Sequence, residues 1–479
     1  MKTKFALTAF ILYTLIGQAQ EAPVKMDSLQ EVIITSTRID LPFKENSRTI
    51  DIISSEDIKN SATTNVADLL QQVAGIDIRR RGTAGSQADI YIRGGSFDQT
   101  LLLIDGIKMD DAQTGHHTMN AALPFEVIER IEIIKGPAAR VFGQNAFTGA
   151  INIVTKKQLK NSVSTNLETG SFGQLNGSLT VGSELENSSH IIHVGKLTSQ
   201  GYRNNSDYNN SNYFIKSVFN KKAQAVEMIA TFFDRKFGAE NFYTTNPAWN
   251  EYEETQNSLI GFTTTFESEK LKIKPRVYWK RNQDMFLLKR NEPNFFRNLH
   301  ITDKMGAEVN ASYSSELGVT GFGVDISKIY IRSNNLGHRN RFMTNVFLEH
   351  QFKLFNNRLD ITPGVAVTYF SDFKFHAFPG LDIGYRLNDH FKIYGNTGYT
   401  YRIPTYTDLF YSDPGTVGNA NLEPEEALSV EIGSKYISPK FTGSFAFFYR
   451  DASSLIDYIK ENETDRFMDT KQRGVYAKG

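Results

Sequence analysis

The chain from residue 161 to residue 479 is a succession of segments in which apolar and polar residues alternate. Val163, Thr165 and Leu167 occupy every second position of one segment, and residues 175–181 and 260–266 repeat the pattern. A period of two places such residues on one face of a β-strand. Helical periodicity is absent from this part of the sequence. It is therefore predicted to consist of β-strands.

The connections between these predicted strands are of two kinds. Tight turns are expected at Asn356-Asn357 and Asn388-Asp389. Long polar loops are expected at residues 200–211, 234–257, 280–303 and 402–426. Alternating strands with short turns at one end and long loops at the other are typical of outer-membrane β-barrels. A soluble β-sandwich is the alternative, and it seldom needs long loops at every second connection. The sequence favours a mainly β fold, a transmembrane antiparallel β-barrel.

Residues 50–154 carry a different pattern, that of a compact α/β domain. Val66, Leu69, Leu70 and Val73 are spaced as one face of a helix, which Asn65 can cap at its start. Short strands are expected at residues 76–79, 90–93, 101–104, 130–134 and 151–154. This region is predicted to fold as one small domain ahead of the barrel.

The first nineteen residues have the organisation of a secretory signal peptide. Lys2 and Lys4 precede an apolar run at residues 6–16, and small residues follow at Gly17 and Ala19. The run is too short for a spanning helix, which needs roughly 20 apolar residues. A polar stretch then leads to a β-prone run, which is either an edge strand of the following domain or a strand that pairs with a partner. Its residues are Glu31, Val32, Ile33, Ile34, Thr35 and Ser36.

Composition narrows the function classes. Lys and Arg number 53, as do Asp and Glu, so the chain lacks the basic surplus of a nucleic-acid-binding protein. The sequence has no cysteine, which excludes disulfides and thiolate metal sites. It contains no hydrolase triad, phosphate-binding loop or zinc-protease motif. We therefore expect a protein that is not an enzyme and carries no resident cofactor.

Five motifs follow one another in the first domain, and together they are specific. They are Asp-Leu-Leu-Gln-Gln-Val-Ala-Gly-Ile at residues 68–76, Tyr-Ile-Arg-Gly at 91–94, Leu-Ile-Asp-Gly at 103–106, Ile-Glu-Arg-Ile-Glu-Ile-Ile-Lys-Gly-Pro at 128–137, and Gly-Ala-Ile-Asn-Ile-Val-Thr at 149–155. Further matches occur at residues 401–404, 408–410 and 418–425. In this order the motifs resemble the TonB-dependent outer-membrane receptors, in particular the group that takes up cobalamin and ferric siderophores.

The resemblance implies a domain organisation. Residues 1–19 would be the signal peptide, 20–45 a periplasmic segment, 46–157 the plug domain and 158–479 a partial β-barrel in the outer membrane. Plugged transporters of this kind have 22 strands, whereas about 15 or 16 alternating segments are present here. We therefore expect a C-terminally incomplete barrel, from a fragment or a truncated gene. Residues 161–479 alone are expected not to close, because closure couples strand number to tilt and shear.

The resemblance also implies a mechanism. The chain would import a scarce chelate of iron or cobalt through a barrel whose plug is remodelled by TonB and its inner-membrane energising complex. The run at residues 31–36 resembles the TonB box and is expected to be loosely tethered until TonB pairs with it. Outer-membrane lipid and the barrel-assembly machinery would be further partners. Two alternatives are a receptor that only captures its ligand and a truncated fragment that transports nothing.

Candidate site residues follow from the motifs and loops. Arg93 and Arg130 resemble the plug arginines that pair with barrel carboxylates in relatives, although two solvated arginines are the alternative. Residues that we expect to contact substrate lie in apical plug segments and long loops: Arg79, Arg80, Arg81, His116, His117, Tyr202, Tyr243 and Trp249. The arginine run could equally be solvated. Adjacent histidines point to different sides of a regular element, which disfavours a metal site built from both. Asp207, among asparagines, is a weak calcium candidate.

Overall fold

The structure is a computed structural model of the chain. It describes residues 33–34, 39, 41–82, 85–121, 123–221, 224–244, 246, 249–413, 415–438, 441–459, 467–469 and 473–478. The predicted signal peptide therefore lies outside the described residues, as do Glu31, Val32, Thr35 and Ser36 of the TonB-box prediction. Among the described helices, none is long and apolar enough to cross a membrane.

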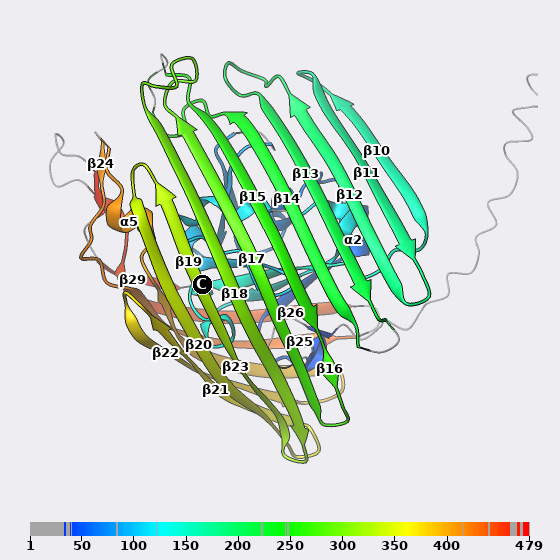
Figure 1. The fold of residues 1–479 in the computed structure, drawn as a ribbon. Helices are drawn as coiled ribbons and strands as arrows, with labels where there is room; N and C mark the ends of the chain where they lie inside the picture. The colour runs from blue at the N-terminus through cyan, green and yellow to red at the C-terminus, as the bar shows by residue number, and fades with distance from the viewer. Residues whose placement is uncertain are drawn as a thin grey trace, which may run out of the picture.

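A 17-stranded antiparallel sheet dominates the structure (Figure 1), and its strands pair in chain order. They are β10 (Ser162–Gly170), β11 (Gln174–Glu184), β12 (Ser188–Ser199), β13 (Tyr208–Phe219), β14 (Val226–Gly238), β15 (Tyr252–Thr264), β16 (Phe266–Glu267), β17 (Leu271–Leu287), β18 (Arg297–Ser315), β19 (Gly318–Ser333), β20 (Gly337–Leu354), β21 (Leu359–Phe370), β22 (Lys374–Arg386), β23 (Phe391–Arg402), β25 (Glu425–Ile437), β26 (Thr442–Leu455) and β29 (Arg473–Lys478). Both β15 and β16 pair with β17, as two parts of one pass. When β15 and β16 are counted as one pass, the sheet agrees with the 15 or 16 strands that the sequence predicts.

The sheet curves around the N-terminal domain, and its two faces differ in chemistry. Apolar side chains such as Phe262, Val277 and Met305 are exposed on the outer face. The alternate positions, such as Lys280 and Asn282, are polar and buried against the enclosed domain. An apolar outside with a polar inside is the pattern of a barrel wall in lipid. Within the described residues, β10 and β29 are the two edges of the sheet. The predicted fold class is confirmed.

Loop lengths follow the expected asymmetry. Connections at one end of the strands include residues 239–251, 288–296 and 403–424, whereas the opposite end has short turns such as residues 316–317 and 355–358. The loop between β17 and β18 is shorter than the predicted residues 280–303, since it comprises only residues 288–296. Strands β17 and β18 continue their pairing to Leu287 and Arg297, so polar residues that suggested a loop belong to the strands. Their inward positions face the enclosed domain rather than lipid, which is why polarity did not mark the end of the strand.

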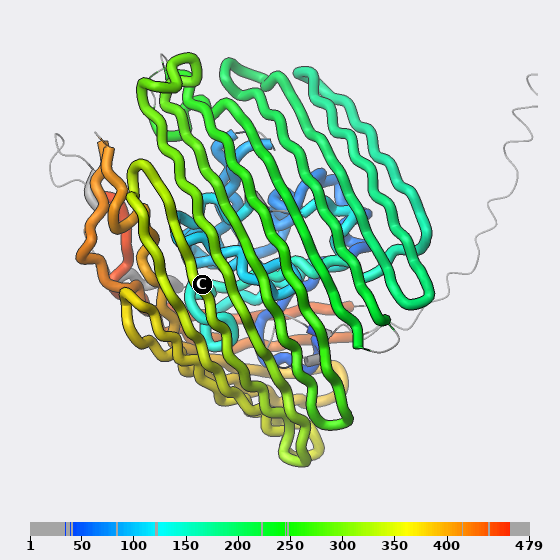
Figure 2. Tube along the Cα trace, viewed as in Figure 1, coloured from blue at the N-terminus to red at the C-terminus, as the bar shows by residue number. Residues whose placement is uncertain are grey.

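The enclosed N-terminal domain contains two small sheets, and Figure 2 shows its blue and cyan trace inside the curved sheet. The larger has the order β3 (Ile50–Ser54), β8 (Ile128–Lys135), β9 (Gly149–Thr155), β6 (Thr100–Ile104) and β7 (Ile107–Lys108). The smaller pairs β4 (Ile76–Arg80) with β5 (Ala88–Ile92). Only β6 and β9 run parallel within the described part of this domain. Buried aliphatic residues of both sheets form its core.

Short helices complete the enclosed domain and the loops. The α-helices are α2 (Ser55–Asn60), α3 (Val66–Gln71), α4 (Ala139–Phe142) and α5 (Tyr406–Phe410). The 3-10 helices are η1 (Phe43–Glu45), η2 (Phe97–Gln99), η3 (Gly115–Ala121) and η4 (Phe125–Val127). Small strands outside the main sheets are β1 (Ile33–Ile34), β2 (Leu41–Pro42), β24 (Thr416–Val417), β27 (Tyr458–Ile459) and β28 (Phe467–Asp469).

The predicted helix face is confirmed in α3. Asn65 caps the helix by accepting a hydrogen bond from the backbone N–H of Asp68. Val66, Leu69 and Leu70 are buried in the core, and Val73 packs against it. The chain then leaves the helix through Gly75, whose φ of 78° suits glycine.

The described part of the TonB-box prediction differs from the loose tether that was expected. Ile33 and Ile34 pair with Pro42 and Leu41 in a two-stranded sheet. The side chain of Ile34 is fully buried in a cluster with Ile50 of β3 and Leu101 of β6. An apolar side chain in this β-prone run gains free energy by docking on the nearest apolar surface, here that of the enclosed domain.

Truncating Leu70 tests the core of the enclosed domain. The Leu70→Ala variant is expected to lower the free energy of unfolding of this domain by about 2–5 kcal/mol, because the side chain is fully buried. The measurement is a urea titration of the detergent-solubilised chain, followed by hydrogen exchange of the amides in β6 and β9. Leu185→Ala, at an exposed turn leucine, is the matched control and should change stability by less than about 0.5 kcal/mol. A Leu70 effect as small as that of the control would show that the helix face is wrongly assigned.

Candidate functional site

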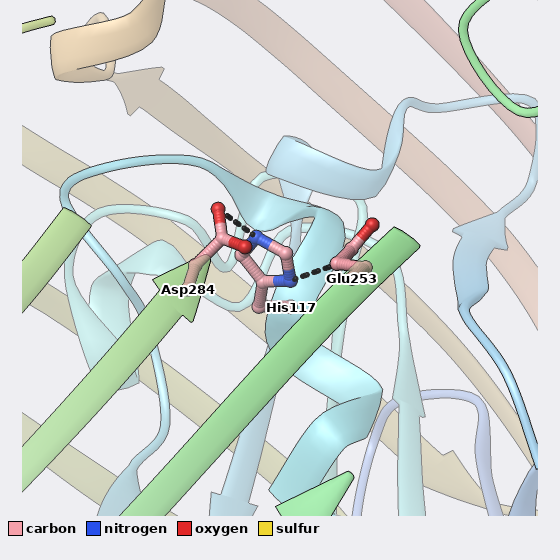
Figure 3. Close-up of side chains that lie close together, drawn as sticks. All are labelled: His117, Glu253 and Asp284. Carbon is pink, nitrogen blue, oxygen red and sulfur yellow. Dashed lines mark ion pairs between the residues drawn. The ribbon is translucent and has the colours of Figure 1, made fainter. Parts of the chain in front are cut away.

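The end of the barrel that carries the long loops holds a cluster of one histidine and two carboxylates (Figure 3). His117 comes from η3 of the enclosed domain, Glu253 from the start of β15 and Asp284 from the end of β17. His117 Nε2 lies 3.1 Å from Asp284 Oδ2, and His117 Nδ1 lies 3.9 Å from Glu253 Oε1. All three side chains are buried. They offer one nitrogen and two carboxylate oxygens as ligand atoms.

The electrostatics of this cluster hold a positive charge on His117. Burial alone lowers the pKa of a histidine, but the carboxylates of Asp284 and Glu253 outweigh burial and raise the pKa of His117 to about 9. The imidazole is therefore protonated at neutral pH when only these side chains surround it. Its charge ties the enclosed domain to Asp284 of barrel strand β17.

Strand register explains why these residues meet. Thr255 of β15 is the partner of Asp284, which in turn is opposite His300 of β18. Glu253 lies two residues from Thr255 and therefore on the same inward face of the sheet. The alternating pattern predicts which positions face inward, but the neighbours across the sheet depend on register. Sequence analysis proposed His117 and missed Glu253 and Asp284 for this reason.

His116 has different surroundings from His117. Its Nδ1 lies 3.0 Å from both carboxylate oxygens of Asp89 in β5. Its ring stacks on Phe97 with the centroids 3.8 Å apart. The two neighbouring histidines thus point to different partners, as expected of adjacent positions.

The three consecutive arginines do not form one patch. Arg79 pairs with Asp77, and both side chains are exposed. Arg80 pairs with Asp68 beside the cap of α3. Arg81 alone reaches the loop at residues 239–251, where its guanidinium donates to the Phe242 carbonyl at 2.6 Å and lies over the ring of Tyr243.

The aromatic candidates are spread over two loops. Tyr243 donates from its hydroxyl to Glu253 Oε2 at 3.2 Å, which ties it to the histidine–carboxylate cluster. Tyr202 is exposed and stacks edge-on against Phe172. Trp249 is half-buried in the loop that contains Tyr243. The structure therefore brings Arg81, His117 and Tyr243 together and leaves Tyr202 apart from them.

The calcium candidate already has a cationic partner. Both carboxylate oxygens of Asp207 accept hydrogen bonds from the guanidinium of Arg290, at 2.6 and 2.9 Å. A calcium ion at Asp207 would have to displace this bidentate arginine. The geometry gives the calcium hypothesis no support.

Buried ion pairs join the enclosed domain to the barrel wall. Arg93 donates to Glu431 of β25 at 2.5 Å, as the comparison with family motifs predicts. Arg130 donates to Glu132, which lies on its own strand β8. Pairs that sequence analysis missed are Arg48–Asp382, Arg140–Asp382, Lys108–Asp325, Lys216–Asp105 and Lys304–Asp110. Charged residues at inward positions of predicted strands indicate that ion pairs with the enclosed domain are present. The sequence does not indicate which residues pair.

An enclosed α/β domain tied by buried ion pairs to a barrel wall with an apolar outer face defines a plugged outer-membrane barrel. Two family models match the chain: the TonB-dependent receptor plug domain over residues 42–150 and the TonB-dependent receptor-like β-barrel over residues 158–475. The chain belongs to the TonB-dependent receptor family. It is an outer-membrane protein.

Relatives and solved structures agree with this assignment. The vitamin B12 transporter BtuB of Vibrio vulnificus is 24% identical over 465 residues, which cover 91% of this chain and 70% of the relative. BtuB of Vibrio cholerae is 23% identical over 459 residues, covering 90% and 71%. The siderophore receptor PirA of Pseudomonas aeruginosa has a TM-score of 0.69 at 19% identity, covering 89% of this chain and 80% of that one. At this identity the structural match shows the fold alone.

Proposed function

We propose that this protein imports a metal chelate, cobalamin or a ferric siderophore, across the outer membrane with energy delivered through TonB. The observation that carries the proposal is a plug domain that fills the barrel and is held there by buried ion pairs. A lumen filled in this way does not act as an open diffusion pore. Passage of a bulky solute requires the plug to move, and the outer membrane has no nucleotide to drive such a movement.

The segment around Ile34 supports a route for this energy. Ile34 is buried against strands β3 and β6, so a pull on the segment acts directly on two strands of the plug sheet. An extended segment with β-prone residues is suited to pairing with a partner strand. TonB would add a strand at residues 31–36, extract Ile34 and loosen the plug from its edge. Insertion of the barrel into lipid would depend on the barrel-assembly machinery.

The chelate would bind at the loop end of the barrel. Arg81, His117 and Tyr243 meet there at the junction of the plug and the loop at residues 239–251. The relatives by sequence are vitamin B12 transporters and the structural neighbour PirA is a siderophore receptor, so both classes of chelate belong in the test.

An uptake assay tests the proposal. The chain is produced in cells that lack their own receptors for both chelates, and uptake of radiolabelled cobalamin and of radiolabelled iron siderophores is measured with and without TonB. Uptake of one chelate that disappears without TonB is expected. Surface binding without uptake in either strain would identify a ligand-capturing receptor, and the absence of both would identify a fragment that transports nothing.

A further inference from the structure

The cluster of His117, Glu253 and Asp284 has the composition of a metal site. Its ligand atoms all lie within 4.8 Å of one another. Figure 3 shows the imidazole between the two carboxylates, with the plug on one side and two barrel strands on the other. We propose that these three residues bind a divalent first-row transition-metal ion such as Zn²⁺, which fastens the plug to the barrel wall.

The geometry is close to that of an occupied site. Zinc binds imidazole nitrogen and carboxylate oxygen at about 2.0–2.2 Å, which puts neighbouring ligand atoms of a tetrahedral site about 3.4 Å apart. The side chains therefore need to approach by little more than about 1 Å at the widest pair. The ion would replace the proton that His117 now shares with the carboxylates.

Oxygen atoms around the cluster lack the hydrogen bonds that buried oxygens normally have. Glu253 Oε1, Asp284 Oδ1 and Asp111 Oδ2 accept none within the described part of the chain. Leaving a buried acceptor unsatisfied costs about 1–3 kcal/mol, and more when it is charged. A bound cation would satisfy the oxygens that face it. This observation is independent of the distances between the ligand atoms.

The charge balance favours a divalent ion. A neutral imidazole and two carboxylates carry a net charge of −2, which a divalent ion cancels. Buried carboxylates are stable when they are paired or coordinate a metal. Calcium and magnesium prefer oxygen ligands alone, whereas an imidazole nitrogen favours zinc and its neighbours in the first transition series.

Surrounding residues hold the carboxylates in place. Gln113 donates to Asp284 Oδ2 at 2.7 Å, and the Tyr243 hydroxyl donates to Glu253 Oε2 at 3.2 Å. His300 lies opposite Asp284 in the register of β17 and β18 and is held by Ser333 at 2.8 Å. The imidazole of His300 offers a further nitrogen ligand atom on the same inward face. Orienting partners of this kind are typical of metal ligands.

Cobalt substitution tests the site directly. The full chain is purified in detergent, treated with a chelator and titrated with Co²⁺ and then with Zn²⁺ at neutral pH. We expect one Co²⁺ per chain with the strong visible absorption bands of a four- or five-coordinate ion, and displacement by Zn²⁺. X-ray absorption of the zinc form should show nitrogen and oxygen ligands that include imidazole. A parent chain without these bands would overturn the proposal.

Variants locate the ion. His117→Gln, Glu253→Gln and Asp284→Asn should each weaken Co²⁺ binding at least 10-fold. His193→Gln is the matched control, because His193 is another buried barrel histidine and shares a hydrogen bond with Thr180. The affinity of this variant for Co²⁺ should equal that of the parent. A circular dichroism spectrum equal to that of the parent confirms that each variant is folded. Unchanged affinity in all three variants would place the ion elsewhere and refute the assignment. Because no chelate enters this assay, its result is independent of the proposed transport function.

Discussion

Replacing Ile33 by proline is expected to abolish uptake of the chelate and to leave its binding at the cell surface unchanged. A proline has no backbone N–H and cannot donate to an added strand. If TonB pairs with residues 31–36, the central donor of that pairing is lost in the variant. Binding should persist because the loop end of the barrel, with Arg81 and Tyr243, is built from other segments. The measurement compares surface binding and accumulation of radiolabelled chelate in the same cells.

A control separates pairing from a general effect of proline near the N-terminus. Ser28→Pro places proline in the polar stretch that precedes the β-prone run and should leave uptake at the parental level. Parental uptake by the Ile33→Pro variant would remove the assignment of residues 31–36 to TonB. Loss of binding together with uptake would instead show that the change had damaged the plug.

Replacing Asp382 by asparagine is expected to loosen the plug from the barrel by about 3–5 kcal/mol. Asp382 of β22 is the shared partner of two plug arginines, Arg48 at 2.7 Å and Arg140 at 2.9 Å. All three side chains are buried. Asparagine keeps the size of the side chain but removes the carboxylate that both guanidinium groups contact, and it leaves Arg140 with Glu349 alone, at 3.4 Å. Burial lowers the pKa of Arg48, and the carboxylate of Asp382 raises it, so Asp382 stabilises the charge of this plug residue.

Hydrogen exchange of the plug amides measures this loosening in the detergent-solubilised chain. Faster exchange in β3, which follows Arg48, is the expected result. Asp77→Asn is the control, because the Arg79–Asp77 pair lies on the plug but is exposed, and its loss should cost less than about 1 kcal/mol. Equal exchange in the Asp382 variant and the parent would show that this ion pair does not hold the plug.

Much of the fold follows from local sequence. Alternation with a period of two predicts strands from residue 161 onward, and the structure confirms them up to the described strand β29. The helix at Val66–Gln71 follows from apolar spacing and from Asn65 at its start. These predictions succeed because they depend on neighbours within a few residues, where periodicity and capping act. The docking of Ile34 was not predicted, since it depends on an apolar surface assembled from β3 and β6.

The sequence by itself determined which side chains point inward, and only the tertiary structure decided which of them meet. Arg48 and Asp382 are 334 residues apart in the chain, and Arg93 and Glu431 are 338 apart. The cluster at His117 likewise joins one plug segment to two barrel strands. Partners of this kind depend on the register of every strand pair, the curvature of the sheet and the seating of the plug within it. Those quantities accumulate over the whole barrel, so no local pattern encodes them.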